Sequence, residues 1–208
     1  MRNLFLVILL ALFVPVASWA NSASVSFSNS GGKLTTNGST ITLSNATLGS
    51  FSGLGINASG SLGTVSFTTG ALHSGSLALS GSFLSGGTFT ITSNGTGGLP
   101  NAVLFTGTFS GPVNWVGTYN PAGNNGKGAW TYTLTAQVKG TLWNGQPATG
   151  GTVQFSFDVP NSFQFGPHHS ARGNNGLTTV AVPEPGTLSL LGTGLFAVGG
   201  LLRRRLSA

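Results

Sequence analysis

The chain has 208 residues, of which 39% are hydrophobic and only 5% are charged. Its 14 Phe and 4 Trp argue against a disordered chain, because disordered chains combine few apolar residues with high net charge. Half of the formal charge of +6 comes from the two ends, and the cations between them are scattered, so we expect no binding to nucleic acid. The chain has no Cys, and its stability therefore cannot depend on disulfides.

Residues 1–20 have the parts of a secretory signal peptide. Arg2 supplies the positive start, and an apolar run and a small residue, Ala20, follow it. We predict cleavage by signal peptidase between Ala20 and Asn21. An uncleaved anchor is the alternative, but the apolar run is shorter than the roughly 20 residues with which a helix spans a bilayer.

Residues 21–99 alternate apolar residues with Ser and Thr, and clusters of Gly and Asn separate the alternating runs. A period of two predicts strands with one buried face, and Gly and Asn accept the positive φ of tight turns. The predicted strands centre on Val25–Phe27, Ile41–Leu43, Val65–Phe67, Leu77–Leu79 and Phe89–Ile91.

The strongest strand patterns lie in residues 100–160, where we predict an antiparallel meander and the main core. The four predicted strands are residues 103–109, 112–119, 129–143 and 152–159. They hold Trp115, Trp130 and Trp143, whose rings could form a platform for sugar contact. Core packing is the other interpretation, because Trp at alternating strand positions usually faces inward.

These patterns predict an all-β ectodomain over residues 21–165, built as an antiparallel β-sandwich or a jelly-roll-like fold. A β-solenoid is the alternative, because Gly-Ser-Leu and Gly-Ser-Phe recur, although at uneven intervals. Residues 166–181 are predicted to form a flexible tether. A signal-peptide helix and a C-terminal transmembrane helix are expected to flank this domain.

Residue types that catalysis and metal binding need are scarce. Asp158 and Glu184 are the only carboxylates, so a paired-carboxylate mechanism has no second acid within the domain. A Ser-His-Asp triad would need Asp158 with His73, His168 or His169, and no nucleophile motif marks a Ser. The adjacent His168 and His169 have no Cys or carboxylate at ligand spacing. We therefore expect no enzymatic activity, no metal and no cofactor.

The segment from residue 182 to residue 208 has three parts in a fixed order. A short motif comes first, formed by Val182, Pro183, Glu184 and Pro185. An uncharged run over residues 188–202 follows, and as a helix it would be about 22 Å long, shorter than the ~30 Å hydrocarbon core of a bilayer. The cluster Arg203, Arg204 and Arg205 comes last and is expected to stay in the cytoplasm, which places the domain outside. A buried C-terminal helix is the alternative.

These three parts resemble the PEP-CTERM sorting signal, and the resemblance covers residues 182–205. It implies that exosortase, a membrane transpeptidase, recognises the tail and processes it near Pro183, Glu184 and Pro185. It also implies a bacterium that makes exopolysaccharide, transient anchoring in the inner membrane, and a final place on the cell surface or in the extracellular matrix. Gly186 stands where the family often has Ser or Ala.

Three functions are compatible with the sequence. The first is an exported, non-enzymatic structural protein of the surface or of the exopolysaccharide matrix. The second is a carbohydrate-binding module for exopolysaccharide, with Trp115, Trp130 and Trp143 as its contacts. The third is a hydrolase with an unrecognised site.

Overall fold

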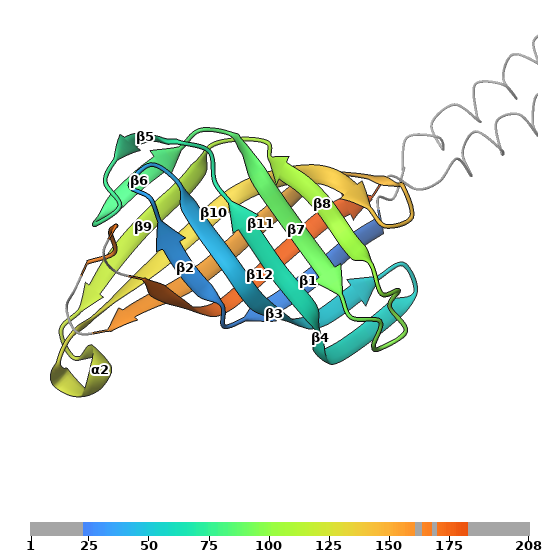
Figure 1. The fold of residues 1–208 in the computed structure, drawn as a ribbon, viewed down its shortest axis with the longest axis horizontal. Helices are drawn as coiled ribbons and strands as arrows, with labels where there is room; N and C mark the ends of the chain where they lie inside the picture. Colours follow the sequence, from blue (N-terminus) through green and yellow to red (C-terminus); the bar gives the residue numbers. More distant parts are fainter. Residues whose placement is uncertain (1–22, 161–163, 168–169, 183–208) are drawn as a thin grey trace, which may run out of the picture. The chain divides into compact units, whose positions relative to one another are not determined.

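The computed structural model describes residues 23–160, 164–167 and 170–182 (Figure 1). The predicted signal-peptide helix, the cleavage point between Ala20 and Asn21, and the predicted C-terminal transmembrane helix all lie outside these residues. Among the described residues, no helix is both long and apolar enough to cross a membrane.

The described residues form one sheet of twelve strands and a single short helical turn. In chain order these elements are β1 (Ala23–Ser30), β2 (Lys33–Thr36), β3 (Ile41–Gly53), β4 (Ile56–Thr68), β5 (Leu72–Gly75), β6 (Ser80–Phe83), β7 (Gly86–Ser93), β8 (Val103–Phe109), β9 (Val113–Asn120), α2 (Gly123–Gly126), β10 (Ala129–Leu142), β11 (Pro147–Pro160) and β12 (Ala171–Val182). Several strands are longer than the usual five to six residues, because the Ser/Thr and apolar alternation continues along them.

The sheet closes on itself. Strand β10 pairs with β11, β11 with β12, β12 with β2, β2 with β3, β3 with β4, β4 with β7, β7 with β8, and β8 with β10 again. The edge of β10 has two successive partners, β9 along Ala129–Thr135 and β8 along Val138–Leu142. Strands β6 and β5 extend the sheet beyond β9. Figure 1 shows the tilted strands following one another around a common interior.

The first and last strands of the chain, β1 and β12, are neighbours in the sheet. The hydroxyls of Ser26 on β1 and Thr179 on β12 are 3.2 Å apart. At its other end β12 pairs with β2, where Arg172 is opposite Lys33. The predicted processing points at the two ends of the chain therefore flank two neighbouring strands.

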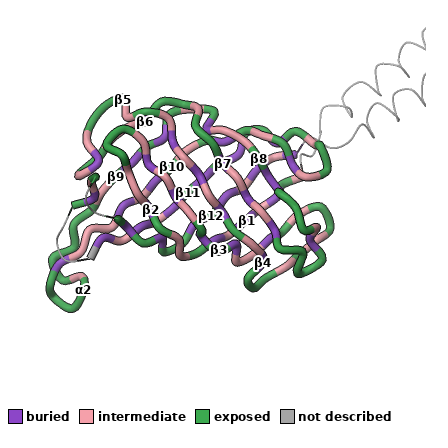
Figure 2. Tube along the Cα trace, in the orientation of Figure 1, coloured by how far each residue is buried: buried purple, intermediate pink, exposed green. Residues whose placement is uncertain are grey.

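The interior is filled with apolar and aromatic side chains. Buried residues alternate with intermediate or exposed ones along most strands, as Figure 2 shows by the change between purple and pink or green. The largest fully buried side chains include Trp115, Tyr132, Phe89 and Phe155. Some Gly residues make room for these rings. A Cβ at Gly117 would lie 2.5 Å from Cε1 of Tyr132, the residue directly opposite on β10.

The all-β prediction is confirmed, and most predicted strands lie within observed ones. The expected arrangement in two separate layers is not what forms, because the ladders join all strands into one closed sheet. Alternation along a strand defines its two faces but not its neighbours, so sandwiches and closed sheets share the pattern. The solenoid alternative also differs from the structure, in which each described ladder is antiparallel.

Two local predictions are wrong. Residues 171–181 of the expected tether belong to β12, which pairs with β11 and β2 and buries Ala171, Val180 and Val182 in the interior. Leu77–Leu79 form a bend and not a strand, because three carbonyls in a row accept hydrogen bonds from neighbouring strands. Leu77 O accepts from Nε1 of Trp115 at 2.9 Å, Ala78 O from the Tyr132 hydroxyl at 2.8 Å, and Leu79 O from the Gly117 amide at 2.6 Å.

Candidate functional site

The sorting motif predicted from the sequence begins where the sheet ends. Val182, its first residue, is the last residue of β12 and is 1% exposed. Pro183, Glu184 and Pro185, and the cluster Arg203 to Arg205, lie outside the described residues. Since β12 occupies most of the expected tether, the motif follows the folded strand with no linker between them. Any cut upstream of Val182 would remove residues that the core buries.

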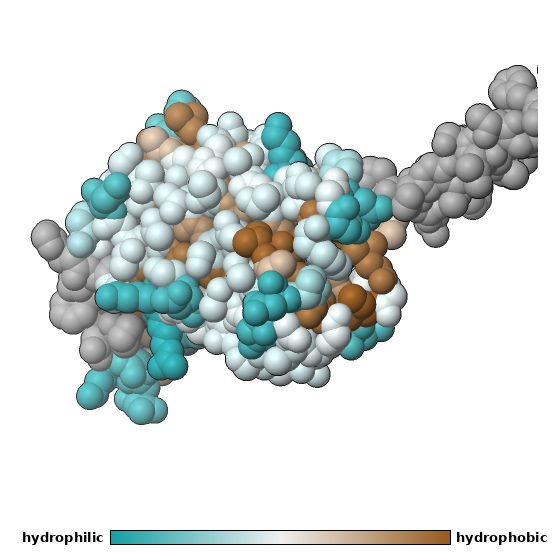
Figure 3. Space-filling model, turned by 45° about the vertical axis from the view of Figure 1, so that its right-hand side comes forward, coloured by the Kyte–Doolittle hydropathy of each residue, from teal (hydrophilic) through white to brown (hydrophobic). Residues whose placement is uncertain are grey.

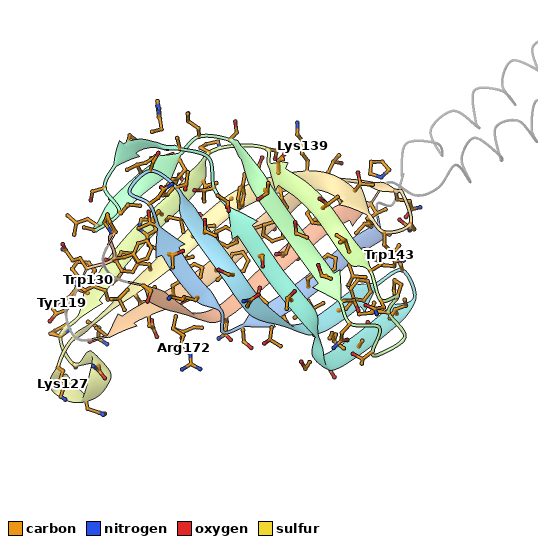
Figure 4. All side chains as sticks on the ribbon, in the orientation of Figure 1. Tyr119, Lys127, Trp130, Lys139, Trp143 and Arg172 are labelled. Atoms are coloured by element: carbon orange, nitrogen blue, oxygen red, sulfur yellow. The ribbon has the colours of Figure 1, made fainter. Side chains whose placement is uncertain are left out.

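The three Trp proposed as a sugar platform are separated by the fold. Trp115 is 0% exposed and stacks on Tyr132 with ring centroids 4.7 Å apart. It cannot contact a glycan in this fold, and the prediction for this residue is wrong. Trp130 and Trp143 are partly buried against the core, and Figure 4 shows them at opposite ends of the sheet.

An aromatic pair lies at the end that holds Trp130. Tyr119 on β9 is directly opposite Trp130 on β10, and their ring centroids are 5.3 Å apart. Tyr119 is 43% exposed, and Lys127, in the turn that joins these strands, is at the same end (Figure 4). At the other end, Trp143 packs edge-on against Phe51 with centroids 5.7 Å apart.

Tyr132 links three parts of the interior through its hydroxyl. It donates to Ala78 O and accepts from the Phe165 amide at 2.9 Å. Burial raises the pKa of the Tyr132 phenol above its ordinary value, and the hydrogen bond from Phe165 opposes this in part. Tyr132 is therefore neutral at physiological pH, and its role in the described structure is to hold the 77–79 bend and Phe165 on the core.

The candidate catalytic residues are not brought together. Asp158 lies half-buried on β11, where it accepts hydrogen bonds from Thr131 Oγ1 at 2.9 Å and from Nδ2 of Asn174. His73 is exposed on β5, and His168 and His169 are not among the described residues. Within the described part of the chain, no three His, Cys, Asp or Glu residues cluster at metal-binding distance.

A hollow on the outer face of β9, β10 and β11 has no counterpart among the sequence predictions. Its polar lining includes Asn114 on β9, Gln137 on β10 and Gln154 on β11. Each looks like an ordinary outward-facing position. Only the strand register brings them to one place, and register was the part of the fold that the pattern left open.

The family comparison decides the role of the C-terminal segment. The model of the PEP-CTERM protein-sorting motif matches residues 181–205. The chain carries a PEP-CTERM sorting signal. It is therefore an exported protein that passes the membrane and is sorted through exosortase. No curated protein and no solved structure matches the chain, so the PEP-CTERM match covers the tail and leaves the closed sheet without a recognised family.

Proposed function

We propose that this PEP-CTERM protein is a non-enzymatic structural component of the cell surface or of the exopolysaccharide matrix. The observation that carries the proposal is a packed, closed sheet with a hydroxyl-rich outer face, whose last strand runs directly into the sorting motif. Such a domain has a self-contained core, and its tail specifies its route.

The outer face supports a role in a hydrated matrix. Rows of Thr cross the strands, and one of them joins Thr35, Thr42, Thr68 and Thr88 on β2, β3, β4 and β7. A second row contains Ser66, Thr90, Thr106 and Thr141. On the face that Figure 3 shows, most of the described surface is pale and of intermediate hydropathy. Neutral hydroxyls interact with water and sugars without the salt dependence of charged groups.

The absence of an enzymatic role is part of this proposal. Asp158 is held by Thr131 and Asn174, and no His is near it among the described contacts. A general acid or base must reach a substrate proton within hydrogen-bonding distance. Conversion of a glycan by the purified protein that is lost on changing Asp158 to Asn, with the fold retained, would contradict the proposal.

The proposed route starts with signal peptidase, which cuts after Ala20, and continues with transient anchoring in the inner membrane. Exosortase then removes the tail near Pro183–Pro185, and the domain reaches the surface or matrix. The two ends of the sheet fit this order, since β1 begins at Ala23 and β12 ends at Val182. The mature protein would consist almost entirely of the closed sheet.

Mass spectrometry of the protein from membrane, surface and medium fractions tests this route. We expect a mature form that starts at Asn21 and lacks Arg203–Arg205. A variant with Pro183→Ala, Glu184→Ala and Pro185→Ala should accumulate in the membrane fraction with its tail intact. Pro121→Ala, an exposed loop proline outside the motif, is the matched control. Surface or released protein that keeps the complete tail would contradict the proposal.

A carbohydrate-binding module is the second candidate function, and the Tyr119–Trp130 pair is the observation that favours it. A half-exposed aromatic pair beside a Lys offers a ring surface to the apolar face of a sugar and a donor to its hydroxyls. If this site binds glycan, Tyr119→Ala with Trp130→Ala should abolish retention on a polysaccharide gel. Phe51→Leu beneath Trp143, at the other end, should leave retention unchanged.

A further inference from the structure

A hollow of about 450 Å³ lies on the outer face of the sheet, and neither Trp130 nor Val182 is among its lining residues. It forms where the edge of β10 changes partner from β9 to β8, between Thr135 and Val138. The link from β8 to β9 passes there, and the Ser110 amide donates to the Gln137 carbonyl at 2.9 Å. Gly111 in this link has no side chain to fill the space above Gln137.

Two rows of the ladder supply the lining. Asn114 on β9, Thr135 on β10, Gln154 on β11 and Leu177 on β12 are successive register partners. Gln137 pairs with Thr152 in the next row. With strands about 4.8 Å apart, the first row extends roughly 14 Å, which is long enough for several linked sugar rings.

The polar lining is neutral and has free hydrogen-bonding capacity. Among the described residues, the side chains of Asn114, Thr135, Gln137, Thr152 and Gln154 are exposed and make no hydrogen bond to another protein group. Elsewhere on the outer face, hydroxyls pair with one another, as in Ser28 with Ser50 and Thr42 with Thr68. Each amide offers two donors and one acceptor oxygen, which match the mixed donor and acceptor character of sugar hydroxyls.

Apolar groups complete the hollow at two sides. Leu177 is 52% exposed in a row that is otherwise polar, and Pro112 lines the hollow beside the β8–β9 link. These side chains can cover the C–H face of a sugar ring while the amides bind its hydroxyls. No lining residue is charged, which disfavours phosphate, nucleic acid and acidic chains as ligands.

We propose that this outer-face hollow binds a segment of a neutral polysaccharide chain. The inference rests on the proposed placement of the sheet in an extracellular matrix. The hollow is open and lacks an aromatic platform, so a single site should bind weakly, with a dissociation constant on the order of 0.1–1 mM. Retention in a matrix would come from many copies on one polymer, through multivalency.

Electrophoresis of the full chain in mild detergent, through gels with and without embedded dextran, tests the proposal. Alginate, a polyanion, is the counter-probe. We expect dextran to slow the wild-type protein, and Asn114→Ala with Gln137→Ala and Gln154→Ala to weaken this effect at least about tenfold. Thr64→Ala with Thr90→Ala and Thr106→Ala, on β4, β7 and β8, is the matched control. Thermal unfolding verifies that both variants keep the fold.

Nuclear magnetic resonance tests the same site in the wild-type protein, without any substitution. The side-chain amide signals of Asn114, Gln137 and Gln154 should shift when dextran oligosaccharides are added. The proposal fails if dextran does not slow the protein, if only alginate does, or if the control variant loses as much binding. It also fails if Tyr119→Ala with Trp130→Ala abolishes binding and the hollow variant does not. Tail processing is measured separately, so the route and the binding site can fail independently.

Discussion

The same strands build two faces of different chemistry, and the contrast between them explains how this chain can be almost uncharged and still fold. The inner face is packed with rings, such as Phe89, which lies about 6 Å from four other Phe rings. The outer face carries many hydroxyls, and some of them pair across strands, as in Thr42 with Thr68. Stability should therefore depend on the shape of the inner residues, and function on the chemistry of the outer ones.

The largest effect is expected from removing a ring at the centre of the inner face. Phe89→Ala should lower the free energy of unfolding by about 3–5 kcal/mol, because it removes buried area and leaves a cavity among Phe67, Phe105, Phe109 and Phe155. Urea titration of the purified protein measures this. Phe89→Leu, which keeps most of the volume, should cost clearly less. Equal losses for both variants would mean that packing is not the source.

A smaller loss is expected from filling a space that the inner face needs. At Gly176, an added Cβ would overlap the ring of Phe155 and approach Asn29 Oδ1, so Gly176→Ala should destabilise by roughly 1–3 kcal/mol. Gly166→Ala is the matched control, since a Cβ added there would have nothing within 4 Å. The free energies of unfolding of the two variants should differ by this amount in the same titration. A Gly176→Ala variant as stable as the wild type would contradict the packing of the Phe155 ring against β12.

Tyr132 tests the polar connection within the interior. Tyr132→Phe leaves Ala78 O and the Phe165 amide without their partner, which should cost about 1–3 kcal/mol near pH 7. The pKa of this phenol is raised in the folded state, so the unfolded state loses its proton first. Wild-type stability should therefore fall as pH rises through the ordinary value of 10.0 and above.

The matching measurement is the free energy of unfolding between pH 7 and about 11. Part of the alkaline decrease should be absent in Tyr132→Phe. Tyr119→Phe, at the exposed end, is the control and should keep the decrease. A variant at Tyr132 with the same alkaline slope as the wild type would show that another group causes it.

The sequence predicted which residues of a strand face the interior better than it predicted which strands pair with one another. The alternation of apolar and polar residues predicted β8 and most of β10 and β11 at the right positions, because the burial of alternate residues can be read from a short stretch of sequence. It missed β12, where Arg172–Gly176 interrupt the alternation and long-range pairing with β11 and β2 decides the structure. The Leu77–Leu79 bend was missed for a similar reason, since its hydrogen-bond partners, such as Trp115, are distant in sequence.

The candidate sites divide in the same way. The motif at Val182–Pro185 could be predicted from the sequence, because a sorting signal is a continuous stretch of residues that does not depend on how the rest of the chain folds. The sugar platform could not, because Trp115, Trp130 and Trp143 are close in the chain but face different surroundings. Asn114, Gln137 and Gln154 could not be grouped until the register of β9, β10 and β11 was known.

The smallest effect on stability is expected from the Thr row on the outer face. Thr90→Val, Thr106→Val and Thr141→Val keep the β-branched shape that suits a strand, so the free energy of unfolding should change by less than about 1 kcal/mol. Solubility should fall, because three neighbouring hydroxyls on β7, β8 and β10 become an apolar patch. Both are measured on one preparation, by urea titration and by precipitation with ammonium sulfate.

The matched control for this row is Ile91→Val, at an inner position of β7 next to Thr90. It should lower the free energy of unfolding by about 0.5–1.5 kcal/mol without affecting solubility, since the side chain is buried. The outer-face variant should therefore change mainly solubility, and the inner-face variant should change mainly stability. If the outer variant lost stability instead, the hydroxyls of the outer face would contribute to the stability of the sheet, and the division of labour between the faces would not hold.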